Sequence, residues 1–256
     1  MLCVHCGHPI TQTYRKFQGG QIRLNICPHC HHRADEYIEL DNVVKFLDLI
    51  LLKKEVYRHI LFNHFDYQDK FIQKIIIQLA IVMILFITYS KMVFDQRSED
   101  CSILYNECDN AIKIFSRKVK DKLFYFILES AVEMIAYITG ILFAIRIYLF
   151  LFFRNIILFK YNYVVIALIF SSFGQLFLIL PMIWNYNINF FKIIDYFVII
   201  SNIVAICVVV EANFLKSGLI VMFGLLFKYF SSKYSINWLA NNFGIFGSIP
   251  TSEINF

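Results

Sequence analysis

Residues 161–191 form a run of 31 positions without a charged side chain. An α-helix needs about 20 apolar residues to cross a bilayer, so this run can hold one span with aromatic residues left at the interfaces. Hydrophobic residues make up 59% of the chain, charged residues 17%, and the mean hydropathy is +0.60. These values exclude an ordinary soluble domain and predict a mostly α, polytopic helical membrane protein.

The apolar runs place the membrane domain at residues 71–230. The segment 217–227, between two lysines, is too short to span alone, so it is expected to be re-entrant or interfacial. Pro181 is expected to end or kink a span. The polar tail is predicted over 231–256. Four spans are predicted, over residues 71–90, 123–145, 162–184 and 196–215.

Two glutamates, Glu129 and Glu133, fall inside the second predicted span, where ionisable groups are costly. They share one helical face with Ala136, Gly140 and Ala144, a stripe of small residues typical of close helix packing. Both carboxylates are therefore expected to point into protein or a polar cavity. Either Glu129 lies near the interface and Glu133 hydrogen-bonds a neighbouring helix, or the two form a polar site for a lipid headgroup.

The first thirty residues contain two C-x-x-C pairs, formed by Cys3 with Cys6 and by Cys27 with Cys30. Each pair can place two thiolates on one metal ion, and together they complete a tetrahedral shell. Gly7 follows the first pair, where a tight turn favours positive φ. Alternating apolar residues over 22–26 indicate a β-hairpin arm. The pattern predicts a small N-terminal β zinc ribbon over 1–33, with zinc in a structural role.

Other uses of these thiols remain open at this point. The pairs could form disulfides or a redox dithiol, although no secretory leader precedes them and structural disulfides are rare in reducing compartments. Iron could occupy the same four-sulfur shell. Cys101 and Cys108, between the first two spans, are a candidate lumenal disulfide. Five histidines near the site are expected to be neighbours rather than ligands: His5, His8, His29, His31 and His32.

The segment 34–70 is predicted to be an amphipathic or interfacial helical segment. Asp41 or Asn42 can cap a helix that runs to about Asn63. Residues 46–52 are apolar except for Asp48, and cationic side chains flank them. This helix could lie in the membrane interface or on the spans, with its cations towards lipid phosphates, or it could be a core helix of a small globular domain built with the ribbon.

Three motifs follow the ribbon in order: Y-x-E-x-D-N from Tyr37, D-L-x-L-L-K from Asp48 and Y-R-H-x-L-F-N from Tyr57. With the paired cysteines, these motifs make residues 3–63 resemble the ARV family of endoplasmic-reticulum membrane proteins linked to sterol and sphingolipid homeostasis. Candidate contacts with lipid or a partner are Tyr37, Glu39, Asp41, Asn42, Asp48, Tyr57, Arg58, His59, Asn63, Glu129 and Glu133.

The resemblance implies sterol transport or distribution, sphingolipid homeostasis and support of glycosylphosphatidylinositol-anchor assembly. It also implies membrane lipids and other endoplasmic-reticulum membrane proteins as partners, with the Golgi as a second location. The alternative is an adaptor that scaffolds lipid-metabolic enzymes without moving lipid. The sequence contains no P-loop, dinucleotide fingerprint, G-x-S-x-G or H-E-x-x-H motif, so no enzymatic activity is expected.

The apolar spans argue against a nucleic-acid partner and favour anionic lipid headgroups for the basic residues. Reduced thiols and the basic residues before the first span favour a cytosolic N-terminus. The basic residues between 91 and 122 oppose this orientation, because they would then lie in the lumen.

Overall fold

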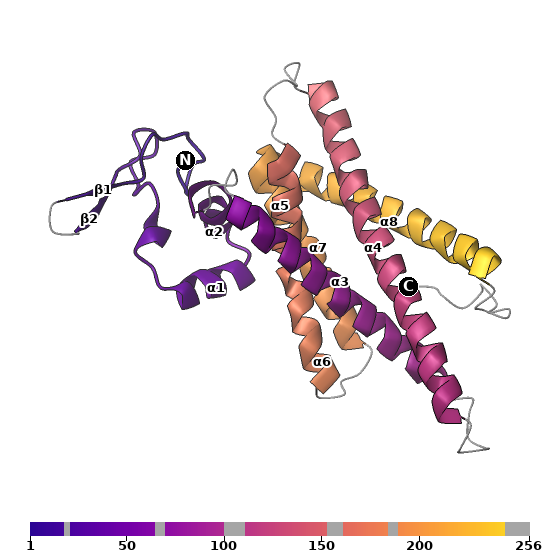
Figure 1. The fold of residues 1–256 in the computed structure, drawn as a ribbon. Helices are drawn as coiled ribbons and strands as arrows, with labels where there is room; N and C mark the ends of the chain where they lie inside the picture. Colours follow the sequence, from indigo (N-terminus) through magenta and orange to yellow (C-terminus); the bar gives the residue numbers. More distant parts are fainter. Residues whose placement is uncertain (18–20, 65–69, 100–110, 153–160, 184–188, 244–256) are drawn as a thin grey trace. The chain divides into compact units, whose positions relative to one another are not determined.

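The computed structural model describes the chain except for residues 18–20, 65–69, 100–110, 153–160, 184–188 and 244–256 (Figure 1). Cys101 and Cys108 lie outside the described residues. The chain forms two compact units. The first comprises 1–83 and 155–221, and the second comprises 84–154 and 222–256.

The first unit begins with an antiparallel hairpin of β1 (Tyr14–Lys16) and β2 (Ile22–Leu24), in which Tyr14 pairs with Leu24. The predicted hairpin is therefore present. Short helices and then long ones follow. They are η1 (Glu36–Ile38), α1 (Asn42–Ile50), α2 (Lys54–Arg58), the π-helix η2 (His59–His64), the start of α3 (Lys70–Glu99), α5 (Tyr161–Ser171), the 3-10 helix η4 (Ser172–Leu178), α6 (Ile179–Ile183) and α7 (Asn189–Val210).

The helix predicted to run to Asn63 is broken after α1. Leu52 has a φ of +57°, its N–H bonds Leu49 O at 3.1 Å, and Lys53 N–H bonds Asp48 O at 3.1 Å. This pair of bonds around a left-handed residue is a Schellman motif, which ends a helix and turns the chain. The segment therefore folds back as α2 and η2 instead of extending as one rod.

Residues of the N-terminal segment and the long helices share one hydrophobic core in the first unit. Val4, Leu49 and Tyr57 are buried in the same cluster as Ala167 of α5 and Ala205 of α7. A ribbon with two strands of three residues cannot bury enough apolar surface to be stable alone. Packing against α5 and α7 supplies the missing core.

The second unit contains the rest of α3, α4 (Ala111–Phe152) and most of α8 (Phe214–Phe243). A Cβ added at Gly140 of α4 would lie 2.7 Å from Phe227 Cβ, and one added at Gly224 of α8 would lie 2.4 Å from Ile141 Cγ1. Only glycine permits these approaches. The small-residue stripe predicted on the second span therefore meets another helix at Gly140.

Within the described residues, four helices are long and apolar enough to cross a membrane: Leu123–Leu151, Tyr161–Leu178, Phe190–Val210 and Phe214–Tyr234. This result confirms a mostly helical polytopic fold with a small N-terminal sheet. The apolar stretch of α3, Ile76–Met92, is shorter than these four helices, so the first predicted span, 71–90, is not among them. The third predicted span changes helix type at η4, just before Pro181 in α6, which cannot donate to the carbonyl of Phe177.

The C-terminal part differs from the sequence expectation. The segment 217–227 was predicted to be re-entrant or interfacial, but it lies inside the continuous helix α8. The tail predicted from 231 is helical through Phe243. The prediction took Lys216 and Lys228 as the two ends of the apolar segment. Lysine, however, is a good helix former, and its long side chain can reach a polar group from within a span.

Candidate metal centre and its attachment to the membrane helices

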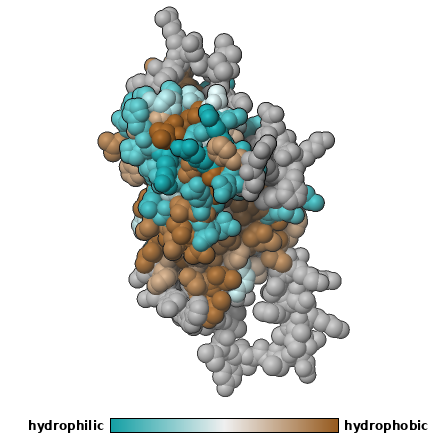
Figure 2. Space-filling model, turned by 90° about the vertical axis from the view of Figure 1, so that its left-hand side faces the viewer, coloured by the Kyte–Doolittle hydropathy of each residue, from teal (hydrophilic) through white to brown (hydrophobic). Residues whose placement is uncertain are grey.

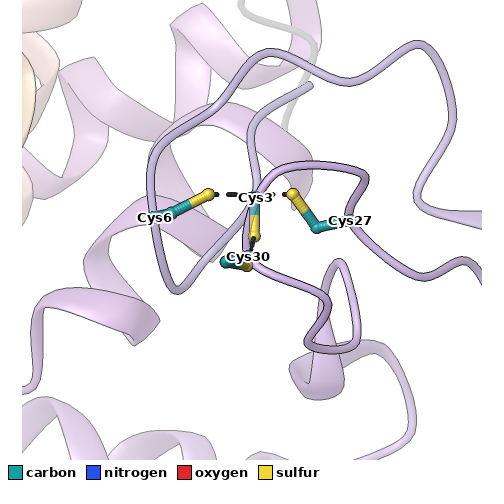
Figure 3. A group of neighbouring side chains, drawn as sticks. All are labelled: Cys3, Cys6, Cys27 and Cys30. Atoms are coloured by element: carbon teal, nitrogen blue, oxygen red, sulfur yellow. Dashed lines mark hydrogen bonds between the residues drawn. The ribbon is translucent and has the colours of Figure 1, made fainter.

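The four N-terminal cysteines converge on one point (Figure 3). Their sulfur atoms all lie within 4.8 Å of one another, and the Cys3–Cys30 and Cys6–Cys27 pairs are both 3.7 Å apart. A tetrahedral ion with metal–sulfur bonds of about 2.3 Å requires sulfur separations of roughly 3.8 Å. A disulfide requires about 2.05 Å. The geometry therefore fits a four-thiolate metal site, and all four cysteines are free.

The two cysteine pairs are held by the same backbone turn. Gly7 N–H donates to Cys3 O at 2.9 Å, and His31 N–H donates to Cys27 O at 3.0 Å. The donor has positive φ in both turns, +78° for Gly7 and +60° for His31. Glycine adopts this conformation freely, whereas histidine pays a steric cost. The turn after Cys6 could be anticipated from Gly7, but the equivalent turn after Cys30 carries no glycine.

The surroundings of Cys3 and Cys27 give their thiols different pKa values. Burial raises the pKa of Cys3 to about 12. Burial also acts to raise that of Cys27, but hydrogen bonds from the backbone N–H groups of Cys30 and His29 oppose it and bring the pKa to about 6. Of these two thiols, Cys27 is therefore the one that readily supplies a thiolate to an incoming cation.

The nearby histidines pack against one another. The rings of His5 and His32 are 5.1 Å apart, and those of His8 and His29 are stacked at 5.2 Å. His8, His29, His31 and His32 are exposed. Four sulfur atoms already complete a tetrahedral shell, so these rings are neighbours of the site, as the sequence predicted.

Arg58 connects helix α2 to the first cysteine turn. Its Nη1 donates to Val4 O at 2.7 Å and to His5 O at 2.8 Å. Both carbonyls belong to the residues between Cys3 and Cys6. The position of α2 is therefore coupled to the backbone that carries two of the four sulfur atoms.

A buried carboxylate, Asp35, joins the ribbon to η2. It accepts from the backbone N–H of Tyr37 at 3.1 Å, from His59 Nδ1 at 2.8 Å and from Asn63 Nδ2 at 2.8 Å. Asn63 also exchanges two 2.8 Å bonds with the backbone of Leu2. Asp35 was absent from the predicted site residues. Its only sequence signal is an acidic side chain two residues before Tyr37, where aspartate caps short turns.

Asp48, the polar exception in the apolar run, is buried in α1. It accepts from Tyr37 OH at 2.9 Å, and Lys53 Nζ lies 2.7 Å from its second oxygen. The Lys53 hydrogen bond lowers the pKa of Asp48 against the effect of burial. Burial and the hydrogen bond to Asp48 raise the pKa of Tyr37. This trio fixes η1 against α1.

Tyr57 anchors α2 to the long apolar helices. Its hydroxyl lies 2.8 Å from Ser201 Oγ of α7, and Ser201 donates to Ser171 O of α5 at 2.7 Å. Ser171 in turn donates to Asn202 Oδ1 at 2.5 Å. These four side chains are buried. The chain of bonds runs from the ribbon side into two candidate spans.

Most of the predicted contact residues near the ribbon are thus engaged inside the protein. Tyr37, Asp48, Tyr57 and His59 are buried. Arg58 and Asn63 are half-buried and bonded to the ribbon backbone. By contrast, Glu39, Asp41 and Asn42 are exposed at the start of α1, and the Asp41 side chain makes no capping hydrogen bond.

The two glutamates of α4 lie within the second unit. Lys91 Nζ of α3 is 3.0 Å from Glu129 and 2.7 Å from Glu133. Lys228 Nζ of α8 is 3.7 Å from the other oxygen of Glu133. Both carboxylates therefore pair with lysines of neighbouring helices, as predicted for Glu133, and Glu129 shares the same lysine.

The profile of the Arv1-like family matches residues 2–206. The resemblance seen in residues 3–63 thus extends into the membrane helices. "Protein arv1 homolog" of Dictyostelium discoideum is 34% identical over 235 residues, 89% of this chain and 92% of that protein. "Protein ARV1" of Homo sapiens is 31% identical over 259 residues, covering 96% and 87%. "Protein ARV1" of Saccharomyces cerevisiae is 43% identical over 63 residues, covering 25% and 20%. No solved structure matches significantly.

Proposed function

Because the chain belongs to the Arv1-like family, we propose that it is a multi-pass endoplasmic-reticulum membrane protein that mediates sterol distribution and sphingolipid homeostasis. The proposal extends to the Golgi as a second location and to support of glycosylphosphatidylinositol-anchor assembly. Its lipid partners would be sterols, sphingolipids or anchor intermediates. The family match over residues 2–206, which includes both the metal site and membrane helices, carries the proposal.

The proposed cofactor is a structural zinc ion. Four cysteine sulfurs that lie within 4.8 Å of one another, two pairs of them at 3.7 Å, suit zinc, which accepts tetrahedral sulfur ligation. Cys3, Cys6, Cys27 and Cys30 would hold the ion, and four protein ligands leave no position for a substrate. Zinc bound in this way stabilises the fold of the ribbon and performs no reaction. Iron is the competing ion for the same ligands.

The attachment of the ribbon supports a role at the membrane surface. Hydrogen bonds of Arg58 connect the first cysteine turn to α2, and the buried bond of Tyr57 connects α2 to α7, so the ribbon is not a freely tethered module. In the proposed orientation the N-terminus is cytosolic, where reducing conditions preserve the thiols. The ribbon would then present a rigid cytosolic surface next to the lipid that the membrane domain handles.

The experiment is replacement of the relative in Saccharomyces cerevisiae by this chain, followed by measurement of sterol delivery from the endoplasmic reticulum to the cell surface. Wild-type chain should sustain delivery, and Cys27→Ser should not. Cys207→Ser, a change of a buried cysteine of α7 outside the metal site, is the matched control. If yeast cells that lack both this chain and the yeast relative still deliver sterol normally, the proposed sterol role is wrong.

The adaptor alternative is favoured by the exposed polar residues Glu39, Asp41 and Asn42. A partner could recognise these side chains, since the cap hydrogen bond that Asp41 could make to the helix is not formed. Under this alternative, Glu39→Gln combined with Asp41→Asn should reduce sterol delivery in cells while the melting temperature and metal content stay unchanged.

Purified full-length chain in proteoliposomes separates the two functions. Transfer of a fluorescent sterol faster than in protein-free vesicles would favour direct movement. Delivery in cells without transfer by the purified chain would favour the adaptor. The proposal assigns no enzymatic reaction to the chain, so turnover of a lipid by the purified protein would contradict it.

A further inference from the structure

Helix α1 has apolar side chains on two opposite faces. Leu49 is buried in the core of the first unit. Val43, Val44, Leu47 and Leu51 follow the spacing of one helical face on the opposite side, and their exposed fractions lie between 38% and 70%. Leu40, just before the helix, is also exposed. We call these five residues the outer face of α1.

The outer face resembles the outward surface of a membrane helix. On α7, Ile193 is 59% exposed and Ile200 is 42% exposed, within the range of the outer face. Both belong to the candidate span Phe190–Val210. Soluble surfaces rarely carry a contiguous stripe of four large aliphatic side chains. The outer face therefore needs an apolar environment outside the first unit.

The outer face lies next to a candidate span. Phe46 of α1 contacts Phe173 of η4 edge to face, with ring centroids 6.4 Å apart. Phe173 is part of the candidate span Tyr161–Leu178. Figure 2 views the side that carries the ribbon and α1: hydrophilic residues gather in its upper part, and hydrophobic residues form a continuous area below them. The ring contact between Phe46 and Phe173 therefore places α1 directly beside this span.

Basic residues follow the apolar stripe. Lys53 and Lys54 follow α1, and both are exposed. Lys53 Nζ pairs with Asp48 at 2.7 Å, so Lys54 is the one of the two that is offered to lipid. A cation at the edge of an apolar helical face can reach lipid phosphates while the apolar side chains contact acyl chains. A protein groove would also accept an apolar face, but the contact of Phe46 with a candidate span favours the bilayer.

We propose that α1 lies in the interface of the bilayer that the spans cross, with Val43, Val44, Leu47 and Leu51 among the acyl chains. Lys54 lies at the level of the phosphates. The ribbon is then held directly on the membrane surface. This inference rests on the membrane location of the apolar helices and does not depend on which lipid the protein handles.

The test is site-specific photo-crosslinking of the full-length chain in native membranes. A photoreactive amino acid at Val43 or Leu47 should form lipid adducts in a yield similar to one at Ile193, the positive control on α7. The same probe at Arg15, an exposed position on β1, should form few lipid adducts. Protein adducts at Val43 and Leu47, or lipid yields no higher than at Arg15, would overturn the proposal.

A second position guards against local perturbation by the probe. Leu51 lies at the other end of the stripe and is 68% exposed, so the probe there has room. Variants are compared only when their metal content and melting temperature match those of wild type. Lipid adducts at all three positions support an interfacial α1, whereas lipid adducts at Leu51 alone contradict it.

Discussion

Tyr57 and Ser201 are 144 residues apart in the sequence, and their side-chain oxygens are 2.8 Å apart. The direction of this bond follows from the neighbouring one. Ser201 has a single hydroxyl proton and donates it to Ser171 O at 2.7 Å, so Tyr57 must be the donor to Ser201. A side chain of the segment next to the ribbon thus completes the hydrogen bonding between α5 and α7.

Replacing the two partners should have unequal effects. Tyr57→Phe removes the donor but leaves Ser201 bonded to Ser171, so we expect a loss of about 1 kcal/mol in the free energy of unfolding. Ser201→Ala leaves a buried tyrosine hydroxyl without its acceptor, so the loss should be larger, about 1–3 kcal/mol. Thermal unfolding in detergent checks the order, with Tyr89→Phe, an exposed tyrosine of α3, as control. Equal losses would contradict the assigned direction.

Removal of one metal ligand should unfold the ribbon. Purified wild type should carry one zinc per chain, and Cys27→Ser should lose it because three thiolates bind more weakly than four. Elemental analysis and limited proteolysis of the first 64 residues measure both effects. Cys207→Ser should keep the metal and the protease resistance. If the purified wild type is metal-free and its cysteines are oxidised, the zinc assignment is wrong and the cysteines form disulfides or a redox dithiol instead.

Asp48 should make stability depend on acidity. The Lys53 hydrogen bond lowers its folded-state pKa, so the stabilisation is complete above the unfolded value of about 4 and disappears as the pH falls through the folded-state pKa. The difference in unfolding midpoint between wild type and Asp48→Asn should therefore shrink as the pH falls below about 4. Asp41→Asn, at the exposed start of α1, should show no such trend. A constant difference for Asp48→Asn would refute the linkage.

Lys91 should be needed for stability only while Glu129 and Glu133 carry their charges. Lys91→Met leaves Glu129 and Glu133 buried without their closest cation, so we expect a loss of about 3–5 kcal/mol. Adding Glu129→Gln and Glu133→Gln should recover most of that loss, since neutral amides do not repel each other. Unfolding in detergent measures both variants, and Lys192→Met, an exposed lysine of α7, is the control. No recovery in the triple variant would argue against the ion-pair account.

The metal site was predictable because residues close together in the sequence specify each of its two turns. The spacing of Cys3, Cys6, Cys27 and Cys30 specifies two turns, and Gly7 marks one of them. The helix break at Leu52 was not predictable, because a leucine with positive φ has no sequence signal and is imposed by tertiary packing. Asp35 was missed for a similar reason, since its importance comes from complete burial between His59 and Asn63.

Hydropathy located three of the four candidate membrane helices, but it did not predict that α8 is long enough to span, and it did not predict the ends of the helices. The lysines at 216 and 228 suggested boundaries, although α8 continues through both. The partner of Lys228 is Glu133, which lies 95 positions earlier in the chain, so the pairing depends on how α4 and α8 pack. Tyr37 and Tyr57 were predicted, like Glu39 and Asp41, to contact lipid or a partner. The structure instead buries both tyrosines in internal hydrogen bonds and leaves Glu39 and Asp41 exposed.

The 3-10 helix η4 has a consequence for how the protein fits its membrane. Its seven residues rise about 2.0 Å each and extend about 14 Å, whereas the same residues in an α-helix would extend about 10.5 Å. The candidate span Tyr161–Leu178, which ends with η4, therefore reaches about 3.5 Å further than an uninterrupted α-helix of the same residues would.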